Sequence, residues 1–131
     1  MSQAVVEEIR GALAELVGAF GRDDTEGYFA SFTPEAIFVF YTEPNVLFGR
    51  DQWRALWDQW HQEGFRVLGC KSSNVQVVAT SSDTGFIVHE VHTEVLVDGE
   101  KNHLRERETI VFRREDDGRW RAVHEHLSSM P

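Results

Sequence analysis

The amino-acid sequence predicts an α+β fold in which three helices come first and a meander of long antiparallel strands follows. Apolar residues recur at three- and four-residue spacing in parts of the first 64 residues, which is typical of helices. After residue 65, β-branched and aromatic runs alternate with polar turn sequences, which indicates strands. This order is typical of helices that cover one face of an antiparallel sheet. A length of 131 residues suits a single domain over 1–131.

Three segments have helical spacing. The first, from about residue 3 to 21, has an apolar stripe made of Val5, Ile9, Leu13, Leu16, Val17 and Phe20. Asp24 or Thr25 is expected to cap a short second helix that ends near Phe32. Asp51 is expected to cap a third helix that ends near Gly64. The apolar stripe of this third helix consists of Trp53, Leu56, Trp57 and Trp60.

Six segments are predicted to be strands, namely residues 36–41, 46–48, 65–80, 86–97, 102–114 and 120–128. A turn at residues 33–35 is expected before the first of them. Asp98-Gly99 is a strong signal for a two-residue hairpin between the fourth and fifth strands.

The hairpin registers decide which side chains share a face of the sheet. The turn at residues 98–99 places His89 opposite Glu108, and we set Ile110 opposite Val123 in the last hairpin. Alternation then gives one more apolar face, which helices should cover. Its members are Ile87, His89, Val91, Thr93, Val95, Leu104, Glu106, Glu108, Ile110, Phe112, Val123, Glu125 and Leu127. A one-residue slip of the last strand would replace Glu125 by His124 or His126.

The composition excludes several kinds of partner and site. The net charge of −9 would repel nucleic acids and anionic membrane surfaces. Cys70 is the single cysteine, so neither an internal disulfide nor a cysteine-rich metal site can form. No apolar run approaches the ~18 residues of a membrane span, and the N-terminal residues lack a signal-peptide pattern. We therefore expect a cytoplasmic protein without nucleic-acid or membrane partners.

Three stretches resemble the SnoaL-like, ketosteroid-isomerase-like branch of the nuclear-transport-factor-2-like superfamily. They are residues 32–36 (Phe-Thr-Pro-Glu-Ala), 47–53 (Leu-Phe-Gly-Arg-Asp-Gln-Trp) and 118–128 (Gly-Arg-Trp-Arg-Ala-Val-His-Glu-His-Leu-Ser). The last is also similar to the tail of the calcium/calmodulin-dependent kinase II association domain. The resemblance implies a cone-shaped barrel, with three N-terminal helices packed on a strongly curved, mostly antiparallel sheet and a ligand pocket between them. It also implies a homodimer formed through the uncovered sheet face.

The resemblance identifies family site positions in this sequence. Positions that line the pocket in relatives fall on Val91, Ile110, Val123, Glu125 and Leu127. Phe40 stands where ketosteroid isomerase needs its aspartate base, and Leu16 and Ile110 replace its oxyanion donors. Apolar residues also stand where the kinase-association pocket carries arginines. The resemblance therefore implies that both of those sites are absent.

His89, Glu108 and Glu125 are the strongest catalytic candidates because the predicted registers place them side by side on three strands. Under the helices, desolvation would raise the pKa of the carboxyls and lower that of the histidine. Adjacent carboxyls would also share a proton, and such a group can exchange protons with a bound ligand. The alternative is that the three side chains only hydrogen-bond one another at a hydrated mouth.

A second polar cluster falls on the opposite face and consists of Glu90, Arg107, His124 and His126. We interpret it as part of a polar dimer interface, unless a slip of the last strand brings a histidine into the pocket. No metal site is expected, because His89 and His92 point to opposite faces of a strand and the pair His124 and His126 lacks further ligands. Without a phosphate-binding glycine loop, no cofactor is expected either.

The remaining pocket candidates are Phe32, Phe40, Trp57 and Glu106. The three aromatic residues are expected in the core and, in part, on the wall of the pocket. The sequence thus predicts a homodimeric protein that binds a small, largely apolar molecule. If catalytic, it would be a cofactor-free isomerase, cyclase or dehydratase that works by acid–base proton transfer. The rival hypothesis is a non-catalytic association or ligand-binding module that oligomerises through its sheet face.

Overall fold

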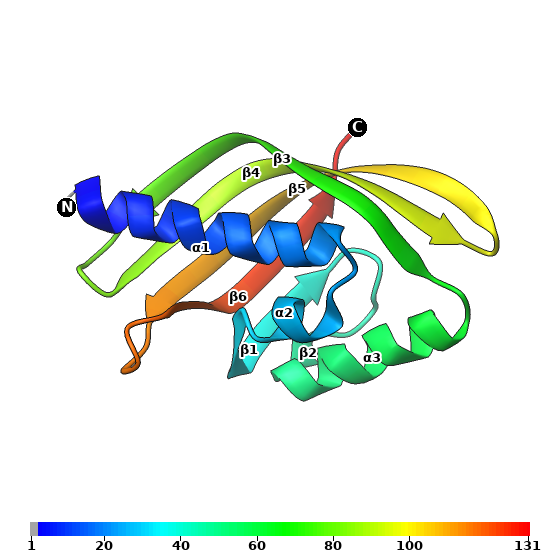
Figure 1. Cartoon of the computed structure of the whole chain (residues 1–131), viewed down its shortest axis with the longest axis horizontal. Helices are drawn as coiled ribbons and strands as arrows, with labels where there is room; N and C mark the ends of the chain where they lie inside the picture. The colour runs from blue at the N-terminus through cyan, green and yellow to red at the C-terminus, as the bar shows by residue number, and fades with distance from the viewer. Residues whose placement is uncertain (1–2) are drawn as a thin grey trace.

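The computed structural model describes residues 3–131 and contains three helices and six strands (Figure 1). The helices are α1 (Gln3–Gly21), α2 (Thr25–Phe29) and α3 (Arg50–Gln62). The strands are β1 (Phe32–Phe40), β2 (Leu47–Phe48), β3 (Arg66–Ala79), β4 (Thr84–Val97), β5 (Glu100–Arg114) and β6 (Trp120–Ser129). No helix within these residues is both long and apolar enough to cross a membrane. The predicted α+β class is confirmed.

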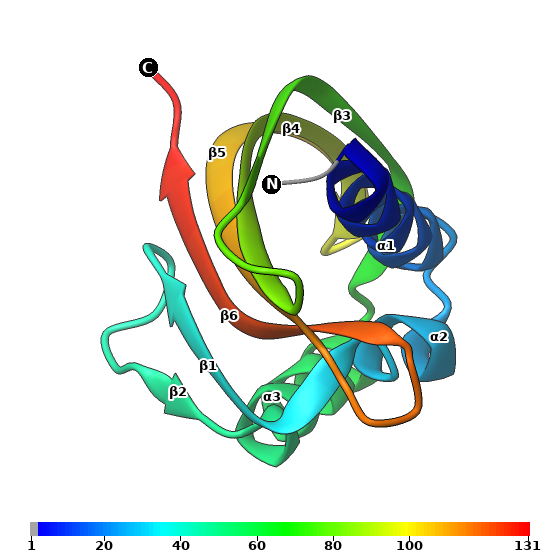
Figure 2. The ribbon, with the colours of Figure 1, turned by 90° about the vertical axis from the view of Figure 1, so that its left-hand side faces the viewer.

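All six strands form one mixed sheet in the order β2-β1-β6-β5-β4-β3. Neighbouring strands are antiparallel, except that β1 and β6 run parallel. Figure 2 shows that the sheet curves strongly around the interior of the molecule. Its edge strands β2 and β3 do not pair with each other, so the sheet is an open cone and not a closed barrel.

The helices occupy the concave side of the sheet and close its open edges. α1 packs against β3, whereas α3 packs against β1 and β2 (Figure 2). Every third or fourth residue of α1 is buried, as the spacing predicts, namely Val5, Ile9, Leu13, Leu16 and Ala19. Asp24 caps α2, because its carboxylate accepts a hydrogen bond of 3.1 Å from the backbone nitrogen of Gly27.

An aromatic cluster joins α2 and α3 to β1. Trp57 stacks on Tyr28 with ring centroids 5.2 Å apart, and Phe32 meets Phe38 edge-on at 5.0 Å. All four rings are fully buried. Burial of such side chains contributes about 1.5–3 kcal/mol each. Since α2 is too short to be stable alone, this packing is what holds it in place.

The predicted register between β4 and β5 is confirmed. His89 lies opposite Glu108, and the pairing continues to the turn at residues 98–99. Both turn residues have positive φ, 51° at Asp98 and 79° at Gly99. This geometry is the one that an Asp-Gly hairpin adopts, which is why the turn sequence fixed the register correctly.

The predicted register of the last hairpin is wrong. Ile110 lies opposite Glu125 and not opposite Val123, and Glu108 lies opposite Leu127. The prediction assumed unbroken pairing along β6.

A β-bulge at Val123 causes this difference. Ala122 and His124 pair with consecutive residues of β5, which leaves Val123 as an extra residue in the strand. The bulge reverses the alternation of side chains, so Ala122 before it and Glu125 after it both face inward, at 0% and 3% exposure. Trp120, which simple alternation placed on the uncovered face, is buried for the same reason.

Two local predictions near β1 and α3 are also wrong. Residues 33–35 do not form a turn but belong to β1, whose pairing with β6 is irregular where Pro34 lacks an N–H group. Asp51 is not the cap of α3, because the helix begins one residue earlier, at Arg50. Gly49 occupies the cap position with a φ of 94°, a conformation that favours glycine.

Because of the bulge, substitutions at Ala122 and Val123 are expected to differ in their effect on stability. Ala122→Asn is expected to lower the free energy of unfolding by about 2 kcal/mol or more, since it overfills the core and buries an amide without partners. Val123→Asn, half-buried on the convex face, is expected to cost about 1 kcal/mol or less. Urea denaturation of both variants measures the difference. A larger loss at position 123 than at position 122 would show that the register is not the one described.

Candidate functional site

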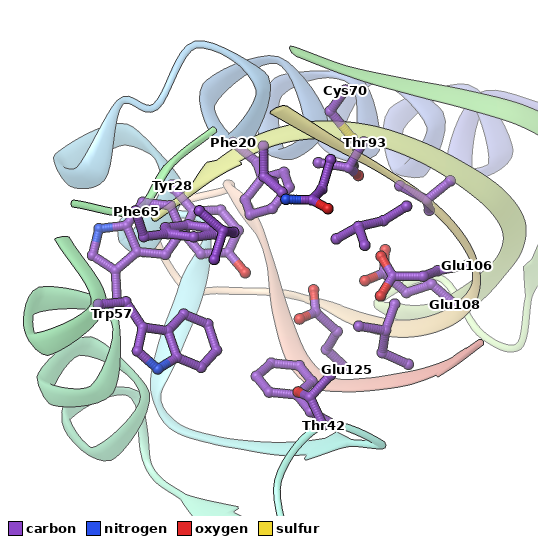
Figure 3. Close-up of a pocket in the computed structure, with 18 of the residues that line it drawn as sticks. Phe20, Tyr28, Thr42, Trp57, Phe65, Cys70, Thr93, Glu106, Glu108 and Glu125 are labelled. Atoms are coloured by element: carbon purple, nitrogen blue, oxygen red, sulfur yellow. Dashed lines mark hydrogen bonds between the residues drawn. The ribbon is translucent and has the colours of Figure 1, made fainter. Parts of the chain in front are cut away.

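A cavity of about 550 Å³ lies between the concave side of the sheet and the helices (Figure 3). All three helices, strand β1 and strands β3 to β6 contribute to its lining. Val91, Thr93 and Val95 form part of its wall because alternate residues of β4 face inward. This volume is within the range of pockets that bind small molecules.

One part of the cavity wall is aromatic. Trp53 and Trp57 project from the same face of α3 because they are four residues apart, and their rings meet edge-on at 5.8 Å. The other aromatic lining residues are Phe20, Tyr28, Phe40, Trp60 and Phe65. Such a wall suits an apolar or aromatic ligand.

Three glutamates from β5 and β6 face this cavity: Glu106, Glu108 and Glu125. Glu106 and Glu108 share a face because they are two residues apart on one strand. Since Ile110 lies opposite Glu125, Glu125 is a diagonal neighbour of Glu108 on that face. Figure 3 shows Glu106 and Glu108 on the side of the cavity away from Trp57, with Glu125 between them and Tyr28.

Burial controls the protonation of Glu108 and Glu125. Desolvation raises the pKa of Glu108 to about 8 and raises that of Glu125 well above its ordinary value. The charge of Glu108 raises the pKa of Glu125 further, so the two carboxyls share a proton in preference to ionising together. The folded protein then binds more protons than the unfolded chain. The contribution of these carboxyls to the free energy of unfolding is therefore most favourable at low pH. It is lost as the pH rises through about 8.

His89 lies behind Glu108 and does not line the cavity. Its Nε2 is 2.8 Å from Oε1 of Glu108, and its Nδ1 is hydrogen-bonded to the hydroxyl of Ser72. Desolvation lowers the pKa of His89 to about 4, so the ring is neutral at neutral pH. A neutral imidazole accepts a hydrogen bond from a protonated Glu108 or, in its other tautomer, donates one to an ionised Glu108.

Tyrosine hydroxyls support the other two glutamates. The hydroxyl of Tyr28 accepts a hydrogen bond of 3.1 Å from Nε1 of Trp53. The hydrogen bond of Tyr28 with Glu125 lowers the pKa of the Glu125 carboxyl. This effect is smaller than the increase in that pKa caused by burial. The hydroxyl of Tyr41 donates to Oε2 of Glu106 at 2.6 Å, and burial together with this bond raises the pKa of Tyr41 to about 12.

The SnoaL-like domain profile matches residues 9–131, which is nearly the whole chain. The chain belongs to the SnoaL-like family. No curated protein matches the sequence.

Solved structures with the same fold include several from bacteria. A ketosteroid isomerase-like protein from Erwinia carotovora atroseptica has 19% identity and a TM-score of 0.83, with 99% of each chain covered. A nuclear transport factor 2-like superfamily protein from Salmonella enterica has 17% identity and a TM-score of 0.84, with 100% of this chain and 94% of that chain covered. A candidate calcium/calmodulin-dependent protein kinase II association domain from Xanthomonas campestris has 16% identity and a TM-score of 0.79, with 95% and 86% covered. At these identities the likeness shows the fold alone.

The SnoaL-like chain brings most of the expected site residues to the cavity. Two of the three catalytic candidates, Glu108 and Glu125, are in its lining, and His89 touches it only through Glu108. The pocket candidates that line the cavity are Phe40, Trp57, Val91, Glu106 and Leu127.

Three residues expected in the pocket lie elsewhere. Phe32 and Ile110 are fully buried in the core and are absent from the cavity lining. Val123 is the extra residue of the bulge in β6 and is absent from the cavity lining. These three assignments as pocket-lining residues were therefore wrong.

The second polar cluster lies on the convex face of the sheet, which no helix covers. Glu90 pairs with Arg107 across β4 and β5. His124 donates from Nδ1 to the backbone carbonyl of Ile37 at 2.8 Å, and His126 is exposed. None of the four cluster residues lines the cavity.

Sequence reasoning missed the contribution of β3 to the site. Cys70 and Ser72 pair with Thr93 and Val91 of β4, and burial raises the pKa of the Cys70 thiol to about 11, so it stays protonated. Two irregularities in the pairing of β3 with β4 prevent the register from being counted back from the turn at residues 81–85. Tyr28 and Tyr41 have no spacing in the sequence that would connect them to Glu125 and Glu106.

Metal-ligating groups do not converge in this part of the molecule. Among residues 3–131, no three His, Cys, Asp or Glu side chains are placed to hold one metal ion. The cavity glutamates are therefore arranged as separate polar groups on an apolar wall and not as a chelating set.

Proposed function

We propose that the protein binds a small, largely apolar molecule in the cavity and moves a proton within it without a cofactor. Isomerisation, cyclisation and dehydration are reactions of this class. The observation that carries the proposal is the pair Glu108 and Glu125, two buried carboxyls on the wall of an otherwise mainly apolar cavity. Buried titratable groups with perturbed pKa values in a concave apolar site are typical of acid–base catalysts.

The carboxyl pair can act as acid and base in the same turnover. With one shared proton, one carboxylate accepts a proton from an acidic C–H bond of the ligand. The other carboxyl gives its proton to a second atom of the ligand, which in a dehydration is the departing hydroxyl, released as water. The pair again holds one proton at the end, so no outside acid or base is consumed.

His89 serves this pair as a positioning residue and not as a catalytic one. It is 1% exposed and contacts Glu108 at 2.8 Å, while its other nitrogen is hydrogen-bonded to Ser72. Because the neutral ring can donate or accept, it supports both protonation states of Glu108. This revises the catalytic role that the sequence suggested for His89.

The carboxyl pair predicts proton exchange on an enolisable probe. In heavy water, the protein is expected to accelerate loss of the α-protons of 2-tetralone, a small apolar ketone, as followed by proton NMR. Glu108→Gln and Glu125→Gln are expected to reduce the acceleration by about 100-fold or more, since each removes a proton-transfer group.

The control variant is Glu15→Gln, which removes the same charge from the exposed face of α1. Its exchange rate should equal that of the parent protein. His89→Ala should shift the pH midpoint of the exchange rate, a change that a purely structural role would not produce. Exchange as fast in Glu108→Gln and Glu125→Gln as in the parent would overturn the proposal.

We also propose that the protein forms a homodimer through the convex face of the sheet. Ile37 and Phe48, paired across β1 and β2, are 37% and 62% exposed, which is unusual for large apolar side chains side by side. The polar cluster with Glu90 and Arg107 lies on the same face and would supply polar contacts. The rival function, a module that only associates, does not need the cavity. We therefore propose dimerisation in addition to ligand binding and not as an alternative to it.

Charge placed on this face should dissociate the dimer. Ile37→Glu is expected to convert the protein from dimer to monomer in sedimentation velocity at micromolar concentration, because it buries a carboxylate in an apolar contact. Ala14→Glu, at an exposed residue of α1 on the other side of the sheet, is the matched control and should stay dimeric. A parent protein that sediments as a monomer at all concentrations would refute the dimer.

A further inference from the structure

The charges of the cavity lining have one sign. Among residues 3–131, the lining contains five acidic side chains and no lysine, arginine or histidine; the acidic ones are Glu63, Asp98, Glu106, Glu108 and Glu125. Glu63 and Asp98 are exposed, whereas the other three lie deeper. The chain as a whole carries a net charge of −9. The resulting potential attracts cations to the cavity and repels anions.

Among residues 3–131, Glu125 has no cationic partner. It is 3% exposed, and the groups that act on its carboxyl are Tyr28, Glu108 and Glu106, none of which is positive. Around the neighbouring Glu108 the situation is the same, because His89 is neutral at neutral pH. A buried carboxyl that is ionised is ordinarily matched by a positive group, and residues 3–131 place no such group at Glu108 or Glu125.

The aromatic wall completes the environment of a cation. Trp53, Trp57 and Trp60 line the same cavity as the glutamates, and Tyr28 contacts both sets, since it stacks on Trp57 and hydrogen-bonds with Glu125. The faces of tryptophan and tyrosine rings attract ammonium groups. Carboxyls and aromatic rings in one cavity are the two features that bind organic cations.

We propose that the ligand of this cavity is an organic cation, an apolar body that carries a protonated or quaternary nitrogen, with the nitrogen at Glu125 and Glu108. The proposal rests on the proposed function of the cavity as a ligand site and names the class of molecule it takes. The apolar body packs against the tryptophans of α3. An anionic ligand would add charge of the same sign as the acidic lining. A neutral ligand would leave Glu108 and Glu125 protonated, without the charge-assisted contact that a cation makes with a carboxylate.

Three probes with the same body and different charge test this proposal. They are 4-phenylbutylamine, 4-phenylbutan-1-ol and 4-phenylbutanoate, whose affinities for the parent protein are measured by calorimetry near pH 7. The amine is expected to bind at least about tenfold more tightly than the alcohol, from cation–π and charge-assisted contacts. The carboxylate is expected to bind most weakly.

Proton release provides a second readout on the same samples. An ammonium group beside Glu108 favours the ionised carboxyl, so binding of the amine should release a proton to the buffer, as shown by calorimetry in buffers of different ionisation enthalpy. Binding of the alcohol should release none. Because these measurements use the parent protein, they do not depend on whether a variant folds.

Substitution then locates the nitrogen. Glu125→Gln is expected to weaken the amine by about tenfold and to leave the alcohol unchanged within about twofold, whereas Glu15→Gln on α1 should change neither. An alcohol or carboxylate that binds as tightly as the amine would overturn the cation proposal while the cavity remained a ligand site. The proposed catalysis is tested separately, by the proton exchange of 2-tetralone. It fails if Glu108→Gln and Glu125→Gln leave that exchange rate unchanged.

Discussion

The extra residue in β6 is the constraint on which the site depends. Residues of a regular strand alternate, so Trp120 and Ala122 could not face the same side as Glu125 and Leu127. The bulge at Val123 makes this possible. The first half of β6 thereby contributes to the core, and the second half contributes a carboxyl to the cavity. Bulges are often found next to functional sites, where they redirect a side chain.

The carboxyls are placed at a cost in stability that the rest of the fold must offset. Desolvation disfavours their ionised forms, which is why the pKa of Glu108 rises to about 8. The ordered aromatic cluster of α2, α3 and β1 supplies apolar burial nearby, and the chain retains a cavity of about 550 Å³ in place of a filled core. The buried carboxyls and the unfilled cavity both reduce stability where function needs a shaped, titratable surface, as is common for binding and catalytic sites.

Much of the fold follows from local sequence signals, and the site follows only in part. The apolar stripe of α1 and the Asp98-Gly99 turn were sufficient to predict that helix and that hairpin, because the geometry of both depends on residues that are neighbours in sequence. The turn also placed His89 against Glu108 correctly. Glu125 was assigned to the correct face, but its partner across the sheet was wrong because a bulge has no clear signature in a single sequence.

Long-range packing explains what the sequence could not predict. Ile110 and Phe32 lie on the inward face of their strands, yet they are packed in the core and do not line the cavity. Tyr28 reaches Glu125 from a helix almost a hundred residues away in sequence, and no spacing rule connects the two. The uniform acidity of the lining likewise becomes visible only when residues from eight elements are seen around one cavity.

The central claim is that Glu108 and Glu125 do not ionise together at neutral pH inside the apolar cavity. It is tested most directly by a carbon-13 NMR titration of glutamate side-chain carboxyls in the ligand-free protein, with Glu108→Gln used to assign the signals. The account predicts that the Glu108 signal titrates with a midpoint near 8, and that the Glu125 signal also titrates above the ordinary glutamate pKa. Midpoints near 4.5 for both carboxyls would contradict it.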